Sequence, residues 1–200
     1  RREKQDRESR LWQQGCEAVG LPPPGRRWVD VSDRGSDLFE YLDFQHRRGG
    51  WYTVRSRHDR ELVEAKEGQS VPLRLHDYAR GLPTLGTKEV AVPARDGKPE
   101  RKARVRIAAS PVTILPPRNP RGQHRHEPLQ TWVVYVGEIK PPQGVQPVEW
   151  ILLTNVPTTT CAEAGERVSW YECRWIVEEL HKAQKTGCGI ESPQFTRVAR

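Results

Sequence analysis

The stretch WVDVSDRGSDLFEYLDFQHRRGGWYTVRSR, residues 28–57, decides the fold of this chain. Residues 27–32 alternate apolar and polar side chains as a short strand does, and Asp33 stands at the C-terminal end of that strand. A helix is expected over residues 37–48, and residues 51–57 are rich in β-branched and aromatic side chains, which favours a second strand. A strand, a helix and a strand within this length predict a βαβ unit with two parallel strands.

The segments on either side of this unit complete the expected architecture. Residues 2–19 place apolar side chains at helical spacing among charged ones, which predicts a helix. Between residues 58 and 146, short alternating runs are separated by turns that contain Gly and Pro, as in antiparallel sheets. Residues 150–154 indicate a buried strand and residues 161–185 one long helix. The expected class is α/β, a mixed sheet with flanking helices that a β-rich antiparallel insertion interrupts.

The same pattern divides the chain into three parts. Residues 1–57 and 148–200 are expected to form one core, and residues 58–147 a β-rich insertion subdomain. Two hundred residues with 35% hydrophobic content suit one domain of ordinary size that carries such an insertion. The chain begins at Arg1 and contains no methionine, so we expect it to be a segment of a longer protein.

Charge and cysteine usage narrow the class of protein. The 33 Lys and Arg residues against 26 Asp and Glu residues give a net charge of +7, which suits a polyanionic partner, although charge alone is weak support. The four cysteines form no CxxC pair and are expected to be reduced thiols. No apolar run approaches the roughly 20 residues that span a bilayer, so a cytoplasmic protein is expected.

The last predicted helix, with the sequence YECRWIVEELHKAQK, carries the most informative pattern. At about 100° per residue, Tyr171, Arg174, Glu178 and Lys185 fall on one face. The plain interpretation is a solvated amphipathic face on which Glu178 pairs with Lys182, and helical periodicity alone favours it. The opposite face is apolar and is expected to pack on a core; it consists of Cys173, Ile176, Val177, Leu180 and Ala183.

The spacing Tyr-x2-Arg-x3-Glu-x6-Lys on this face resembles the signature of one branch of the DDE transposases of bacterial insertion sequences. Tyr171, Arg174, Glu178 and Lys185 match it at every spacing. A second block, VDVSDRGSDLFEYL, resembles the family segment in which an Asp-Arg pair follows a strand and the Asp is the second catalytic acid; that Asp is Asp33 here. The resemblance extends over nearly the whole chain and is weakest in the insertion. It implies a ribonuclease-H-like fold.

The resemblance also implies a chemistry and a cofactor. In this family three carboxylates hold two divalent ions, normally Mg²⁺ with Mn²⁺ as a substitute, that activate water or a 3′-hydroxyl for in-line attack on a phosphodiester. Asp33 and Glu178 are the two acids that this sequence would supply as catalytic and metal-binding residues. Without the resemblance, Asp33 is more simply explained as a turn former or as an acid at a helix N-terminus.

Further positions are implied to contact double-stranded DNA, at the transposon ends and at the target. By resemblance, Tyr171, Arg174 and Lys185 grip phosphates near the cleavage site, and Arg55 on the second strand contributes similarly. Trp150 corresponds to a tryptophan that forms a pocket for a base flipped out of the DNA end during hairpin formation. An exposed strand cation is as good an explanation for Arg55, and a core aromatic residue at a strand start is as good an explanation for Trp150.

Three other residues are candidates for metal ligands. Asp37 is expected to be a first-turn helix acid whose partner is Arg34 or solvent, with a supporting role near the metal as the alternative. His124 and His126 lie in the loop PPRNPRGQHRHEP, which is expected to be exposed and mobile. Because no cysteine pair has ligand spacing, a solvated basic loop is favoured over a zinc site.

The sequence departs from the family in one important place. The family's first acid lies on an upstream strand, and nothing before Arg27 resembles such a strand, so this acid is expected to lie outside the chain. Gly35 stands where the family often has an acidic residue, which suggests altered surroundings of the metal site. The isolated chain is therefore expected neither to assemble the two-metal site nor to cut DNA, and dimerisation on paired ends is expected only of a longer protein.

Two other classes of protein remain open on the sequence. The first is a nuclease on the same fold, which would hydrolyse DNA without joining it. The second is a non-catalytic DNA-binding relic of an inactivated element, which would bind DNA with a steep salt dependence and no metal requirement.

Overall fold

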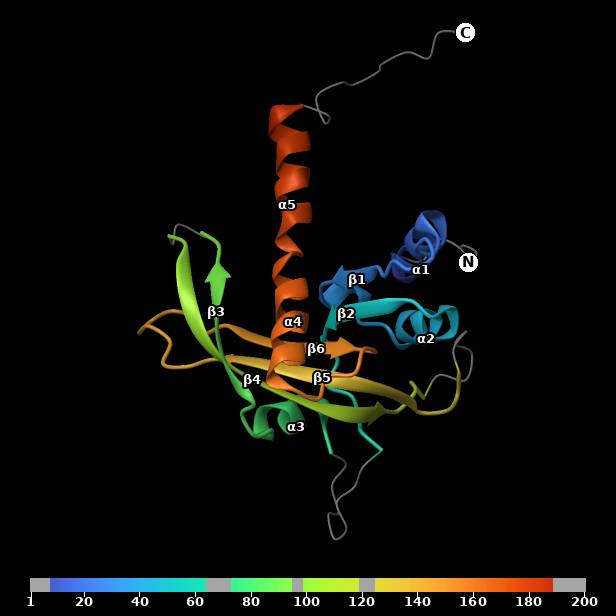
Figure 1. The fold of residues 1–200 in the computed structure, drawn as a ribbon, viewed down its shortest axis with the longest axis horizontal. Helices are drawn as coiled ribbons and strands as arrows, with labels where there is room; N and C mark the ends of the chain where they lie inside the picture. The colour runs from blue at the N-terminus through green and yellow to red at the C-terminus, as the bar shows by residue number, and fades with distance from the viewer. Residues whose placement is uncertain (1–7, 64–72, 95–98, 119–124, 189–200) are drawn as a thin grey trace.

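A computed structural model describes residues 8–63, 73–94, 99–118 and 125–188, and it has one mixed six-stranded sheet flanked by helices (Figure 1). The strand order is β1-β2-β6-β5-β4-β3. The expectation of an α/β fold with a mixed sheet is confirmed. The strands are β1 (Val29–Ser32), β2 (Trp51–Arg55), β3 (Gly86–Val92), β4 (Arg101–Ile114), β5 (Leu129–Glu138) and β6 (Glu149–Thr154). The helices are α1 (Glu8–Val19), α2 (Phe39–Arg48), α3 (Leu75–Gly81), α4 (Cys161–Glu172) and α5 (Trp175–Lys182), with short turns η2 (Arg34–Ser36) and η3 (Ala183–Gly187).

The βαβ unit forms as its sequence predicts. Strands β1 and β2 are parallel, with Val31 opposite Thr53, and α2 connects them. Helix α2 ends at Gly49, whose φ of 72° is the left-handed conformation that glycine adopts without strain. The parallel arrangement places the C-terminal ends of β1 and β2 at the same edge of the sheet, which is where Asp33 follows β1.

The segment between residues 58 and 147 contributes three strands to this same sheet. Strand β6 pairs antiparallel with β2 on one side and with β5 on the other, with Leu152 opposite Val134. The runs 102–109 and 111–115, which the sequence separates, belong to the single strand β4 of 14 residues. Strands β3, β4 and β5 therefore extend the sheet that the βαβ unit begins.

Two hydrophobic cores lie on opposite faces of the sheet. The first core is covered by α2 and α3, which bury Phe39, Leu42 and Leu75 against the sheet. The second core is covered by α4, which contributes Ala164 and Val168. Because successive side chains of a strand alternate between faces, Val31 and Leu152 face α4 while the neighbours of Leu152 face α2. The molecule thus has three layers: α2 with α3, the sheet, and α4. The candidate site lies beside the α4 layer.

The long helix expected over residues 161–185 is present, but it is divided into α4, α5 and the π-helical turn η3. Helix α4 starts with a capping box between Thr160 and Glu163, and α5 and the π-helical turn η3 continue its line away from the sheet (Figure 1). The expectation that its apolar face packs on a core is wrong for α5. Ile176, Val177 and Leu180 are between 52% and 57% exposed, because α5 extends past the sheet and no residue of the helix is buried against the described part of the chain.

The described residues include no helix that combines the length and the apolar character needed to cross a bilayer.

Candidate metal and nucleic-acid site

Asp33 lies where the sequence places it, at the end of β1. It is the N-cap of the turn η2, and its Oδ1 atom accepts a hydrogen bond of 2.9 Å from the backbone N–H of Gly35. The side chain is otherwise exposed to solvent. Both explanations offered by the sequence, a turn former and a carboxylate at the strand end, are compatible with this position.

Arg55 and Trp150 lie close to each other at the same edge of the sheet. Arg55 is the last residue of β2, and its Nη2 atom donates a hydrogen bond of 2.9 Å to the carbonyl oxygen of Glu149, the residue before Trp150. Strand β6 runs antiparallel to β2, so its first residues stand beside the last residue of β2. The guanidinium group is held on the face that also carries Leu152 and α4.

Trp150 contacts α4 through Tyr171. The two ring centroids are 5.1 Å apart and the rings are inclined at 63°, an edge-to-face arrangement that aromatic pairs prefer. Tyr171 is buried in the second core, while Trp150 is only partly buried and packs against that core. Part of the Trp150 ring is therefore held against Tyr171, and part of its surface faces solvent.

Arg174 contacts both Tyr171 and Glu178. Its guanidinium carbon lies 5.9 Å from the centroid of the Tyr171 ring, and its Nη1 atom is 2.7 Å from Oε1 of Glu178. Burial lowers the pKa of Arg174, but the hydrogen bond to Glu178 and the charges of Tyr171, Glu178 and Asp33 outweigh it, so the pKa is raised. The partner of Glu178 is thus Arg174, four residues before it, and not Lys182 as the plain interpretation had it.

Lys185 lies farther out than the other signature residues. It belongs to η3, beyond the C-terminal end of α5, and its side chain is exposed. The structure thus brings Trp150, Tyr171, Arg174 and Glu178 together through successive contacts, whereas no hydrogen bond or ion pair joins Asp33 to any of them in the described part of the chain.

Asp33 and Glu178 are the two exposed carboxylates expected to bind a hard cation. Asp33 and Glu178 supply exposed carboxylate oxygens, and Mg²⁺ is commonly held by one or two carboxylates together with waters and substrate phosphates. Among the described residues there is no group of three or more His, Cys, Asp or Glu side chains arranged to hold a metal. Oε1 of Glu178 is paired with Arg174, and no contact joins Glu178 to Asp33 in the described residues, so a metal ion shared by the two carboxylates stays a prediction.

Asp37 has a different environment from the one expected. Its carboxylate is fully buried, and it accepts hydrogen bonds of 2.6 and 2.8 Å from the backbone N–H groups of Arg57 and His58. Its Oδ1 atom lies 2.5 Å from Nη1 of Arg60. The expectation of an exposed acid paired with Arg34 or solvent is therefore wrong. Arg60 comes from a loop far along the chain, and no local pattern in the sequence indicates this pairing.

The loop that contains the two histidines is described only in part. His124 lies outside the described residues, whereas His126 is described. Arg125, between them, donates through its Nε atom to the buried carboxylate of Asp43 at 2.6 Å. This end of the loop is therefore anchored to α2 and is not the fully solvated segment that was expected.

No family model matches the chain.

Proposed function

We propose that this chain is part of the catalytic domain of a DDE-type DNA transposase, which hydrolyses phosphodiester bonds at transposon ends and transfers the cut strand to target DNA. The proposal rests on the four-residue signature of the last helix, on the Asp-Arg pair after β1 and on the positions of these residues in the fold. A cytoplasmic site of action on the nucleoid and a dimer on paired DNA ends belong to the same proposal.

The observation that carries the proposal is the position of Arg174. This side chain forms an ion pair with Glu178 and is also influenced by the charge of Asp33, although these acids are 145 residues apart in sequence (178 minus 33). Arg174 is thus paired with one of the two candidate carboxylates and is electrostatically coupled to the other, which comes from a separate element. A site for phosphoryl transfer needs this combination, because the carboxylates hold metal ions while the cation contacts a phosphate.

Each residue has a distinct task in the proposed reaction. Asp33 and Glu178 would bind Mg²⁺, which when bound supplies Lewis-acid stabilisation of the reacting phosphate. Arg174 and Arg55 would orient DNA phosphates by bidentate hydrogen bonds, and Lys185 would add a point charge farther along the strand. Tyr171 packs against Trp150, and the solvent-facing part of the indole would stack on an unpaired base.

The most direct test follows metal binding by NMR without requiring activity. Mn²⁺ titrated into the ¹⁵N-labelled chain should broaden the amide signals near Asp33 and those near Glu178 over the same concentration range. The substitutions Asp33→Asn and Glu178→Gln should each weaken the effect at both places, because the two acids share the bound ion.

Asp77→Asn is the matched control, since Asp77 is an exposed acid on α3 and should leave the broadening unchanged. If Mn²⁺ affects only one of the two places, or if neither substitution alters the broadening, the shared metal site is excluded. A chain that binds DNA with no response to Mn²⁺ would instead be a non-catalytic DNA-binding protein.

A further inference from the structure

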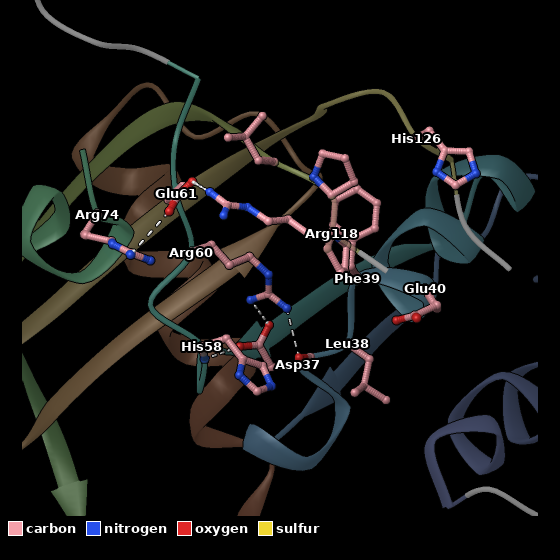
Figure 2. Close-up of a pocket in the computed structure, with 13 residues that line it drawn as sticks. Asp37, Leu38, Phe39, Glu40, His58, Arg60, Glu61, Arg74, Arg118 and His126 are labelled. Atoms are coloured by element: carbon pink, nitrogen blue, oxygen red, sulfur yellow. Dashed lines mark hydrogen bonds and ion pairs between the residues drawn. The ribbon is translucent and has the colours of Figure 1, made fainter. Parts of the chain in front are cut away.

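A second candidate binding surface lies next to the end of β1. A cleft of about 760 Å³ is bordered by η2 and α2 on one side and by the segments that follow β2 and β4 on the other. Figure 2 shows Arg60, Arg74 and Arg118 extending into it from the surrounding segments. Phe39 lines the cleft and belongs to the first core, so the cleft opens on the α2 side of the sheet, opposite α4.

Burial separates the charges of the cleft into inner and outer groups. The inner pair is Asp37 with Arg60, whose side chains are 0% and 10% exposed and which neutralise each other. The outer group is Arg74 and Arg118, whose side chains are 48% and 93% exposed, around the single carboxylate of Glu61, which is 25% exposed. Glu40 also lines the cleft, so three arginines face three acids there, and the most exposed charges are the guanidinium groups of Arg74 and Arg118.

Glu61 holds both outer arginines only loosely, and Arg74 also donates a hydrogen bond of 3.0 Å from Nη1 to the carbonyl oxygen of Asp59. Its Oε1 atom lies 3.3 Å from Nη2 of Arg74, and its Oε2 atom lies 3.6 Å from Nη2 of Arg118 (Figure 2). Ion pairs this exposed contribute little to stability, so an anion with better geometry can take the guanidinium groups from the carboxylate. A phosphate has three or more acceptor oxygens and fits the arginine fork better than a shared carboxylate does.

The rest of the lining suits the sugar of a nucleotide. Leu115, Pro116 and Pro117 line the cleft beside Arg118 and offer apolar surface without charge. A chain of alternating phosphates and sugars would place phosphates at the arginines and deoxyribose on the prolines. A free inorganic anion would use only the arginines.

The cleft also lies within reach of Asp33. Asp33 and Asp37 flank the short turn η2 on its two sides, and four residues span at most about 14 Å. Phosphates of one DNA strand repeat about every 3.4 Å along the duplex axis. DNA that approaches the end of β1 therefore has phosphates close to the Asp37 end of the cleft.

We infer that this cleft, with Arg74 and Arg118 as its contacts, binds the phosphate backbone of double-stranded DNA on the face of the sheet opposite α4. The inference rests on the proposed function for its ligand, and it adds a contact surface on the other side of the sheet. Glu61 acts there as an internal competitor that bridges the two guanidinium groups until DNA displaces it.

The test is the salt dependence of DNA binding, measured by fluorescence anisotropy with a labelled duplex of about 20 base pairs. Each phosphate contact adds about 0.9 to the slope of log K against log salt concentration. The double substitution Arg74→Gln with Arg118→Gln should make the slope shallower by about 1.8. The control is Lys102→Gln with Arg104→Gln, which removes the same charge from exposed positions near the other end of β4 and should change the slope by much less.

The substitution Glu61→Gln tests the inference through an expected gain in DNA affinity. Freeing both arginines should tighten DNA binding several-fold, more than Glu89→Gln does at an exposed position on β3, and the gain should vanish when Arg74 and Arg118 are also substituted. Arg118→Gln alone remains informative if the Arg74 variant unfolds, because the Arg118 side chain is almost fully exposed.

The outcomes separate the two proposals. If the unmodified chain shows no salt-dependent DNA binding, the proposed function falls together with this inference. If the chain binds DNA but the cleft variants behave like their controls, the cleft inference alone is overturned.

Discussion

Arg174 donates a hydrogen bond to Glu178 one helical turn farther on, and its guanidinium group lies at the same time beside the ring of Tyr171. The cation therefore stands where a metal ion and a phosphate would both approach. The positive charge of Arg174 would repel the metal ion and attract the phosphate. Its removal should change the two binding reactions in opposite directions.

For Arg174→Ala we expect tighter Mn²⁺ binding and weaker DNA binding. A unit charge about 4 Å away in water is worth about 1 kcal/mol, which corresponds to roughly five-fold in metal affinity. The loss of one phosphate contact should make the salt slope for DNA shallower by about 0.9. Calorimetry with Mn²⁺ and anisotropy with DNA measure the two effects, and Arg104→Ala at an exposed position on β4 is the control. A parallel change in both affinities would contradict the arrangement.

Trp150 should be needed for binding an unpaired base and dispensable for binding an intact duplex. Stacking on an aromatic side chain is worth about 1 to 3 kcal/mol per base, so Trp150→Leu should weaken binding of a duplex with an unpaired terminal base by about five-fold or more. Quenching of 2-aminopurine at that base reports the contact directly. Trp28→Leu is the comparison, since Trp28 is an exposed tryptophan outside the site. Equal quenching by both variants would rule out stacking on Trp150.

Asp37 should matter for stability and not for metal binding. Removing one partner of a buried ion pair costs about 3 to 5 kcal/mol, because the other charge is left buried without compensation. Asp37→Asn should lower the free energy of unfolding in urea by an amount of this order, while Asp77→Asn, at an exposed acid, should have little effect. A loss of Mn²⁺ binding in a stably folded Asp37→Asn protein would instead assign Asp37 to the metal site.

Stability should decrease as pH falls below about 6.5. Burial lowers the pKa of His46 and also that of His76 in the folded protein. Between the unfolded value of about 6.5 and the lower folded values, the unfolded chain binds more protons, so acid favours unfolding in that window. The stabilising contribution is complete above pH 6.5 and is lost as pH falls through the folded pKa values. Urea titrations at pH 7.5 and pH 5 should show the loss, and His46→Gln should reduce it.

The sequence predicts local features of this fold better than distant contacts. The βαβ unit followed from alternation and helical spacing within 30 residues, and its strand pairing is parallel as expected. The partner of Asp37 did not follow, because Arg60 reaches it from beyond β2 and a charge pair leaves no periodic trace in sequence. The apolar face of α5 shows the same limit. Helical spacing identifies which side chains share a face, but it does not say which surface covers them.

The candidate site also combines features that follow from local sequence with features that depend on distant packing. The relative positions of Tyr171, Arg174 and Glu178 follow from their spacing on one helix. The contact of Tyr171 with Trp150 depends on how α4 lies across β6, which is a property of the packed sheet. The cleft around Glu61 combines segments from β2, α2 and the end of β4, and no single stretch of sequence contains enough of it to indicate a binding surface.

The position of β6 has a consequence for synthesis on the ribosome. Its neighbours are β2, about a hundred positions earlier in the chain, and β5. The nascent βαβ unit therefore emerges long before the strand that must lie along its inner side. Until residue 154 has left the exit tunnel, β2 exposes an unpaired edge, and distant pairings of this kind form slowly. Protection of that edge by a chaperone, or early closure of the β3-β4-β5 meander, would decide how much of the newly made protein escapes aggregation.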